Sequence, residues 1–242
     1  MTWMGEMSES VGQTAGDVVQ PNSYVLVDYT ISVKETGELV DTTVEEEARK
    51  SNVYDASKLY EPRLVVVGRG MLLKAVEDAL VGMKPGESKT FDIPPEQAFG
   101  SRDPAKVKTI PLRRFRDVEG PVRVGDVVSI EGRQGVVRSI GSGRVQVDFN
   151  HVLAGKTLVC TVEVKSIIQD GLERARRLIH GRLPDVPVDK LEVVVQPPEL
   201  RVRLPEEAFL APGLQVAKRA LAKELKEAVS GVEKVVFVEE YT

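Results

Sequence analysis

The stretch VGRGMLLKAVEDALVGMKPGESKTFDIPPEQAFG, from Val67 to Gly100, decides the fold. It predicts the end of a strand, a glycine turn, a short helix, a Pro-Gly turn, a strand and a loop. The turn Lys84–Glu87 has proline and glycine where a type II turn needs them. The stretch holds no nucleophile beside a base, no metal-ligand cluster and no phosphate cradle. We therefore expect a site that works through an apolar floor closed by a loop.

The helix expected in this stretch has one apolar face. That face carries Leu72, Leu73, Val76 and Leu80, and the pattern puts Glu77 and Asp78 on the other side. Gly82 follows the last apolar residue, where a glycine commonly ends a helix. Taken alone, these residues fit an ordinary strand–helix–hairpin unit of an α+β domain equally well.

The same stretch resembles the core of FKBP-type peptidyl-prolyl isomerases, and the match extends to both sides. Upstream, Val27–Thr30 and Glu38–Thr43 resemble the first two pocket strands of that family. Downstream, the sequence NHVLAGKTL at Asn150–Leu158 resembles its loop and closing strand. The chain between Phe99 and Asn150 is longer than the short flap of the smallest members. This length is similar to that of the SlyD-like and archaeal branch, which carries a chaperone domain inserted in the flap.

The resemblance and the strand pattern together imply an α+β fold. We expect an FKBP-like antiparallel sheet wrapped on a short helix, a small all-β domain inserted in the flap and a C-terminal α+β module. The expected parts are a disordered leader over residues 1–22, a discontinuous isomerase domain over 23–104 and 148–170, an inserted β domain over 105–147 and a C-terminal domain over 171–242.

The resemblance also implies a set of site residues. They are Tyr29, Val40, Asp41, Leu72, Leu73, Val76, Phe99, Leu153 and Cys160. Three of them depart from the family pattern. Val76 stands where many members have a tryptophan floor, Phe99 where many have a tyrosine hydroxyl, and Cys160 where a phenylalanine usually walls the pocket.

The function implied is peptidyl-prolyl cis-trans isomerisation joined to chaperone action on unfolded or partly folded polypeptides, without cofactor or metal. The three departures leave an alternative open, a holdase chaperone whose isomerase pocket has decayed. A third hypothesis is an RNA-associated adaptor, suggested by the small β-module and a basic helix. The net charge of −4 argues against nucleic acid as a partner.

Composition adds expectations about setting and assembly. No run of 18 apolar residues exists, and the first 22 residues lack the basic start and apolar core of a signal peptide, so we expect a cytoplasmic protein without a membrane partner. The single cysteine excludes an intrachain disulfide, and the charged composition hints at a thermophile. A three-stranded C-terminal sheet would leave one face open, which suggests a homodimer.

Local signals complete the prediction. Thr43–Glu46 has the pattern of a capping box that opens a short exposed helix. We interpret His151 as a loop residue that orders the Asn-His turn, and His180 as a helix C-terminal residue that interacts with the helix dipole. The sequence predicts no metal site at these two histidines.

Overall fold

A computed structural model of the chain describes residues 18–115 and 121–241, and the predicted leader therefore lies, up to residue 17, outside the described residues. The chain divides into two compact units. The first comprises the described residues up to 32 together with residues 38–91 and 160–241, and the second comprises 33–37 and the described residues of 92–159. Packing in the first unit begins ahead of its first strand. Val19 is fully buried, and its backbone donates to Met83 and accepts from Gly82.

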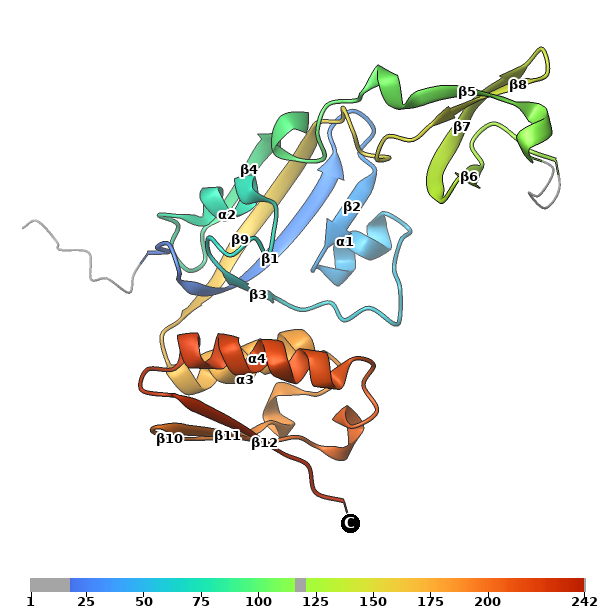
Figure 1. The fold of residues 1–242 in the computed structure, drawn as a ribbon. Helices are drawn as coiled ribbons and strands as arrows, with labels where there is room; N and C mark the ends of the chain where they lie inside the picture. The colour runs from blue at the N-terminus through green and yellow to red at the C-terminus, as the bar shows by residue number, and fades with distance from the viewer. Residues whose placement is uncertain (1–17, 116–120, 242) are drawn as a thin grey trace, which may run out of the picture. The chain divides into compact units, whose positions relative to one another are not determined.

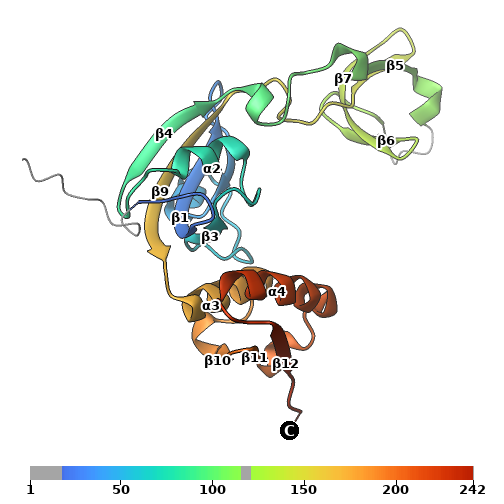
Figure 2. The same cartoon turned by 60° about the vertical axis from the view of Figure 1, so that its left-hand side comes forward.

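A five-stranded sheet forms the core of the isomerase-like part. The strands are β1 (Tyr24–Val33), β2 (Leu39–Thr42), β3 (Arg63–Val66), β4 (Ser88–Ile93) and β9 (Leu158–Ile168). Their order is β2-β1-β9-β4, and β3 pairs with the first half of β1 while β2 pairs with its second half. The helix α2 (Lys74–Leu80) lies against the concave side of this sheet (Figures 1 and 2). The predicted antiparallel sheet wrapped on a short helix is confirmed.

The turn between α2 and β4 has the predicted type II geometry. Gly86 has a φ of 82°, which only glycine adopts without strain, and the Glu87 N–H donates to the Lys84 carbonyl over 3.0 Å. The Gly86 N–H then donates to Val164 of β9 over 2.7 Å. The turn therefore fixes how α2 leads into the sheet.

The predicted capping box is wrong. The helix α1 (Glu45–Lys50) begins after Val44, and no side chain caps its N-terminus. The Thr43 hydroxyl instead accepts from the Tyr29 N–H over 2.9 Å and donates to Asp28 over 2.9 Å. The Thr43 side chain bonds β1 because neither β2 nor β3 pairs with β1 at Tyr29. The Tyr29 N–H therefore finds its acceptor in the Thr43 hydroxyl.

The C-terminal module is the predicted α+β unit with a three-stranded sheet, and its chain order is helix, two strands, helix and strand. Its elements are α3 (Gly171–Arg182), β10 (Glu192–Gln196), β11 (Glu199–Arg203), α4 (Leu214–Ala228) and β12 (Lys234–Val238). The strand β11 pairs antiparallel with β10 and parallel with β12. Both helices lie on the same face of this sheet (Figure 1). The other face of the sheet is left without a covering helix.

The module and the isomerase-like sheet share one hydrophobic core within the first unit. The residues of β1 and β3 alternate, so that one set faces α2 and the other set faces α3. Tyr24, Leu64 and Val66 of the second set pack in the same buried cluster as Leu178 and Ile179 of α3. A shared buried core of this kind resists separation of the two parts because exposing it would return apolar surface to water.

The second unit contains the predicted small β-module. Its strands are β5 (Val107–Pro111), β6 (Val127–Ile130), β7 (Arg133–Gly141) and β8 (Arg144–Asp148), in the order β5-β8-β7-β6 with every pair antiparallel. A compact core of Phe115, Val128, Val137, Val145 and Val147 fills it. The separate antiparallel sheet that the sequence predicts is confirmed.

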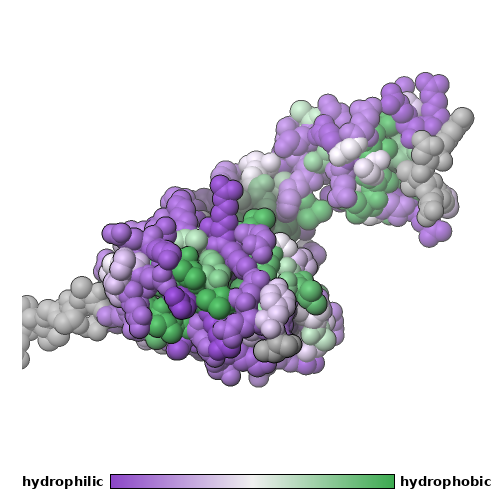
Figure 3. Space-filling view, turned by 60° about the horizontal axis from the view of Figure 1, so that its bottom comes forward, coloured by the Kyte–Doolittle hydropathy of each residue, from purple (hydrophilic) through white to green (hydrophobic). Residues whose placement is uncertain are grey.

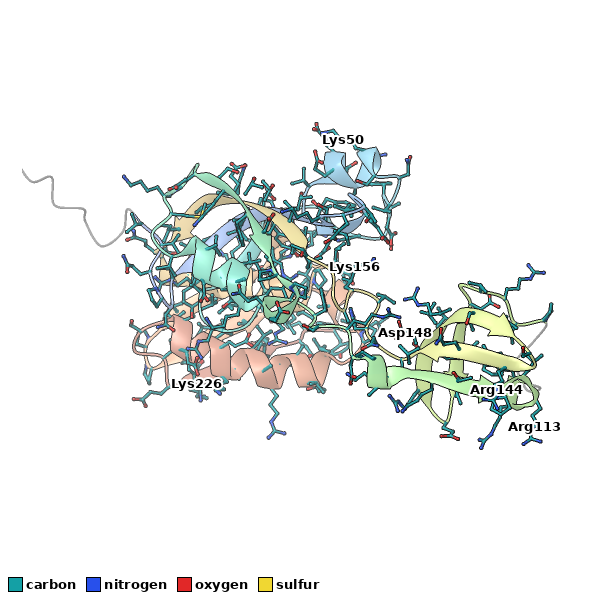
Figure 4. The ribbon with its side chains drawn as sticks, turned by 90° about the horizontal axis from the view of Figure 1, so that it is seen from above. Lys50, Arg113, Arg144, Asp148, Lys156 and Lys226 are labelled. Carbon is teal, nitrogen blue, oxygen red and sulfur yellow. The ribbon has the colours of Figure 1, made fainter. Side chains whose placement is uncertain are left out.

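A buried carboxylate joins the two connections that lead into and out of this module. Asp148 ends β8 (Figure 4), and its side chain is 2% exposed. It accepts from Arg102 over 2.8 Å, and from the side chain and backbone N–H of Asn150. The Asn150 side chain in turn bonds both the N–H and the carbonyl of Asp103. These bonds hold the incoming and outgoing connections together.

The same bonds determine the charge of Asp148. Burial alone would raise the pKa of its carboxyl group, but the two hydrogen bonds from Asn150 and the Arg102 guanidinium outweigh burial and lower the pKa to about 2. A group whose pKa is lower in the folded than in the unfolded chain stabilises the fold above its ordinary pKa. That stabilisation disappears as the pH falls from about 4 to about 2.

Asp148→Asn therefore weakens the second unit at neutral pH by about 2 kcal/mol, the linkage value of the pKa shift, and its deficit shrinks as the pH falls toward 2. Hydrogen exchange of the β7 and β8 amides, measured across this pH range, checks the expectation. Glu131→Gln is the control, because the Glu131 carboxylate is exposed and, within the part of the chain that the structure describes, pairs with exposed Arg114 alone. Equal protection in the two variants at pH 7 contradicts the assignment.

Candidate active site

Tyr29 and Asp41 form a hydrogen-bonded pair across β1 and β2. The Tyr29 side chain is buried, and its hydroxyl donates to Asp41 Oδ2 over 2.7 Å. The Arg63 guanidinium donates to the same hydroxyl over 3.1 Å. Asp41 Oδ1 accepts from Lys58 over 2.6 Å and from the Thr42 N–H over 2.9 Å. The structure thus brings two predicted site residues together and adds Arg63 and Lys58, which the sequence analysis did not single out.

The environment keeps this pair in fixed protonation states. Burial and the hydrogen bond to Asp41 together outweigh the opposing effect of Arg63 and raise the pKa of Tyr29 to about 12. Burial also acts to raise the pKa of Asp41, but the bonds from Lys58 and Tyr29 lower it overall. Neither group changes charge near neutral pH. The pair is therefore suited to holding a hydrogen-bond geometry and not to transferring protons.

The start of α2 supplies three predicted site residues. Val76 is fully buried, whereas Leu72 and Leu73 are partly exposed just ahead of the helix. The family resemblance implies that the backbone N–H groups of Leu72 and Leu73 contact the substrate backbone. The Leu72 N–H instead donates to Glu77 Oε1 over 2.9 Å. Of the two, Leu73, the residue that immediately precedes α2, is the better candidate for that contact.

Glu77 is the residue that the sequence pattern misplaces. It was expected on the side of α2 opposite the apolar face, yet it is only 3% exposed. Its carboxylate accepts from the backbone N–H groups of Gly68, Gly70 and Leu72, over 2.8, 3.2 and 2.9 Å. The spacing of apolar residues cannot identify such a residue. Glu77 is buried because its carboxylate accepts hydrogen bonds from loop N–H groups, and not because it adds to the apolar face. The two glycines with positive φ in that loop were the available signal.

Cys160 and Val40 complete the predicted residues of the first unit. Cys160 lies on β9 and is fully buried, and burial raises the pKa of its thiol to about 12. It is therefore an unreactive core residue. Val40 lies on β2, next to Asp41, and is half-buried.

Phe99 and Leu153 belong to the second unit, where His151 connects them. The rings of Phe99 and His151 stack with centroids 4.4 Å apart and planes 3° from parallel. His151 Nδ1 accepts from the Leu153 N–H over 3.2 Å, and the Gly155 N–H donates to the Gly100 carbonyl over 2.8 Å. His151 therefore orders its loop, as the sequence analysis interprets it, and it also fixes the ring of Phe99.

His180 makes contacts that its sequence position does not suggest. It lies in the last turn of α3 and is buried, where its Nδ1 bonds the Val186 carbonyl over 2.7 Å. Its Nε2 bonds the carboxylate of Glu61, which lies in the long connection between α1 and β3. The interpretation of His180 as a residue that only interacts with the helix dipole is therefore incomplete. Its bond to Glu61 joins residues 119 positions apart in the sequence, which a local pattern does not indicate.

Two features can be stated for the described parts of the chain. Within residues 18–115 and 121–241, no group of three or more His, Cys, Asp or Glu side chains is placed to hold a metal ion. Over the same residues, no helix is both long enough and apolar enough to cross a membrane.

Three family models match successive parts of the chain. Residues 16–114 match the FKBP-type peptidyl-prolyl cis-trans isomerase model. Residues 108–153 match the model described as FKBP26, IF domain, and residues 172–242 match the FKBP26 C-terminal model. The second match covers the module of β5 to β8, and the third covers the module of α3 to β12.

Curated relatives carry the same activity in their names. The chain is 35% identical over 151 residues to the short-type peptidyl-prolyl cis-trans isomerase of Methanocaldococcus jannaschii. The aligned residues cover 62% of this chain and 95% of the relative. It is 33% identical to the FKBP-type 16 kDa isomerase of Escherichia coli K12, over 62% of this chain and 93% of the relative. It is 32% identical to the isomerase SlyD of Aeromonas hydrophila, over 68% and 70%. The chain belongs to the FKBP-type peptidyl-prolyl cis-trans isomerases and carries an IF domain and a C-terminal domain of the FKBP26 kind.

Proposed function

We propose that the protein rotates X-Pro bonds in unfolded or partly folded polypeptides, in a non-covalent pocket that needs no cofactor. The pocket comprises the predicted set Tyr29, Val40, Asp41, Leu72, Leu73, Val76, Phe99, Leu153 and Cys160. The observation that carries the proposal is the Tyr29–Asp41 pair, a polar group that hydrogen bonds hold in place and whose Tyr29 side chain is buried. It matches the position of the family's pocket tyrosine and aspartate.

The mechanism follows from the electronic structure of the amide. Partial double-bond character gives the X-Pro bond a barrier of about 20 kcal/mol, and resonance is lost at the twisted transition state. An apolar slot favours the twisted, less polar state over the planar one, and a hydrogen bond to the substrate backbone holds the twist. An acceleration of about 10⁴ requires only about 5 kcal/mol of differential binding. No proton moves and no covalent bond forms.

The departures at Phe99 and Cys160 set the expected strength of this catalysis. Phe99 keeps the aromatic ring but lacks a hydroxyl donor, and one neutral hydrogen bond contributes about 0.5–1.5 kcal/mol. Cys160 leaves less apolar wall than a phenylalanine would. We infer modest turnover of short peptides and a larger effect on polypeptides that the inserted domain holds. The family matches favour this reading over the alternative of a holdase without catalysis.

The proposed chaperone function resides in the inserted domain, for which we retain the boundaries 105–147. Its described surface exposes several large apolar side chains. They are Leu112, Val124, Val127 and Ile140. The exposed β6 is also an edge strand of its sheet. Exposed apolar side chains and a free strand edge are features that bind extended chains, and tethering a client there raises the local concentration of its prolines at the pocket.

Removing the Tyr29 hydroxyl tests the pocket. Tyr29→Phe keeps the ring, so isomerisation of a short proline peptide is expected to fall about two- to tenfold. Asp41→Ala is expected to cost more, because it leaves Lys58 and the Tyr29 hydroxyl without their partner. Asp78→Ala is the control, since Asp78 is exposed on α2 and, among the described residues, pairs with Lys74 alone. Wild-type turnover in both pocket variants, with the fold intact by circular dichroism, would falsify the assignment.

Exposed apolar side chains test the chaperone function. Val124→Ser combined with Val127→Ser is expected to weaken suppression of aggregation several-fold while short-peptide turnover is retained, because neither residue belongs to the pocket. Val53→Ser is a matched control, being similarly exposed but in the isomerase-like part. Light scattering of an aggregating client and a peptide assay provide the two measurements. If the double variant loses no more suppression of client aggregation than the control does, the chaperone surface lies elsewhere.

We also propose that the C-terminal module self-associates through the open face of its sheet. Figure 3 looks toward this module and shows apolar surface enclosed by hydrophilic side chains. On this face Val194 lies opposite Arg201, which lies beside Val236, and ion pairs such as Glu192–Arg203 flank them. A self-complementary face of this kind suits a two-fold dimer.

Val194→Glu is expected to shift the protein toward monomer in sedimentation at matched concentration, because it places a charge in the centre of that face. Val216→Glu is the control, since Val216 is exposed on α4 away from the sheet. A wild-type chain that sediments as a monomer at all concentrations removes the basis for this proposal.

A further inference from the structure

A cleft of about 710 Å³ lies within the first unit, between the isomerase-like part and the C-terminal module. We call it the inter-module cleft and define it by Tyr29, Asp41 and Lys58 on one side and by His180, Ala220 and Lys223 on the other. The volume is in the range of ligand sites. The contact between His180 of α3 and Glu61 lies on its lining and helps to fix the two sides relative to each other.

The inter-module cleft carries an excess of positive charge. Among its described lining residues are six lysines and arginines and four carboxylates, in a chain whose net charge is −4. Each carboxylate already has a partner within the lining. The pairs are Asp41 with Lys58, Glu61 with His180, Glu224 with Arg182 and Glu227 with Arg69.

Three lining cations are not paired with a lining carboxylate. They are Arg63, Arg177 and Lys223. Arg177 pairs with Glu173, outside the lining, and Arg63 donates to the Tyr29 hydroxyl. Lys223 is exposed on α4, and no ion pair is recorded for it among the described residues. Its charge is available to an anionic group in the cleft.

Apolar side chains lie among these charges. Leu59 is 52% exposed and Met71 is 36% exposed, and both line the cleft together with buried Leu64 and Leu178. Exposed leucine and methionine side chains in a concave site are suited to apolar side chains of a flexible ligand. Charge and apolar surface together match a polypeptide that carries acidic residues between apolar ones.

The cleft is continuous with the candidate active site. Tyr29 and Asp41 belong to both, and Tyr29 lies at the point where β1 changes partner from β3 to β2. A polypeptide held at the Tyr29–Asp41 pair can therefore continue into the cleft. We propose that the inter-module cleft binds an acidic, partly apolar polypeptide segment that flanks the proline. This inference rests on the proposed function, because it takes Tyr29 and Asp41 as part of the isomerase pocket.

A series of labelled peptides tests the proposal on the full-length protein. Each contains the core Ala-Ala-Pro-Phe, extended at one end or the other by Leu-Glu-Glu-Leu or by the neutral Leu-Gln-Gln-Leu. Fluorescence anisotropy gives the dissociation constant of each peptide. At one of the two ends, the peptide with the acidic extension is expected to bind at least about fivefold more tightly than the peptide with the neutral extension. The difference is expected to shrink as the ionic strength rises from about 0.05 M to about 0.5 M.

Two charge reversals on one helix supply matched variants. Lys223→Glu is expected to abolish the preference for the acidic extension, because Lys223 lines the cleft. Lys226→Glu makes the same change of charge on α4, at an exposed residue outside the cleft lining (Figure 4), and is expected to leave the preference intact. Turnover of the unextended core peptide is expected to be unchanged in both variants.

The possible outcomes distinguish a failure of the cleft proposal from a failure of the proposed isomerase pocket. Failure of the wild-type protein to turn over the core peptide contradicts the proposed pocket. Normal turnover without a preference for acidic extensions overturns the cleft proposal alone. Equal losses in Lys223→Glu and Lys226→Glu overturn it as well, since the effect is then one of overall charge. Equal competition by a short single-stranded DNA of the same charge assigns the cleft to polyanions in general and also overturns it.

Discussion

The carboxylate of Glu77 is the constraint on which the site depends. One buried side chain accepts three backbone N–H groups from the loop that leads into α2. A buried carboxylate with three such donors is well satisfied, whereas the same loop without it would lose three hydrogen bonds. The loop carries Leu72 and precedes Leu73, so the position of the apolar floor follows from the position of this charge.

The remaining site chemistry is equally static. Tyr29 keeps its proton because burial and the bond to Asp41 raise its pKa, and Asp41 remains ionised because the bonds from Lys58 and Tyr29 lower its pKa in spite of burial. Cys160 is buried and protonated. A reaction that needs no proton transfer is compatible with groups that do not titrate, and selectivity then depends on shape and on where the polypeptide can continue beyond the proline.

Much of the fold could be predicted from the sequence, because its signals are local. The Pro85-Gly86 turn, the short strands of the inserted domain and the order of the C-terminal elements all follow from spacing and turn residues. The errors have a common cause. Glu77, Thr43 and His180 are polar residues whose partners are set by tertiary structure, and a periodic pattern assigns such residues to the surface or to a cap.

The resemblance located Tyr29 and Asp41, which the structure places in direct contact. No sequence pattern indicated Arg63 and Lys58 as their partners, since Lys58 lies within the irregular connection after α1 and Arg63 directly follows it. The inter-module cleft was likewise beyond prediction. It is formed by residues from β1, β3, α3 and α4, whose relative placement depends on a shared core and not on any local signal.

The strand order of the isomerase sheet has a consequence for synthesis on the ribosome. The strand β9 lies between β1 and β4, yet it follows the entire inserted domain in the chain. The host sheet therefore cannot close until the inserted domain has been translated. The inserted domain, whose four strands are contiguous in the sequence, is free to fold while its host is still open. Once folded, it shortens the effective loop that β9 must close to reach β1, which lowers the entropic cost of completing the host.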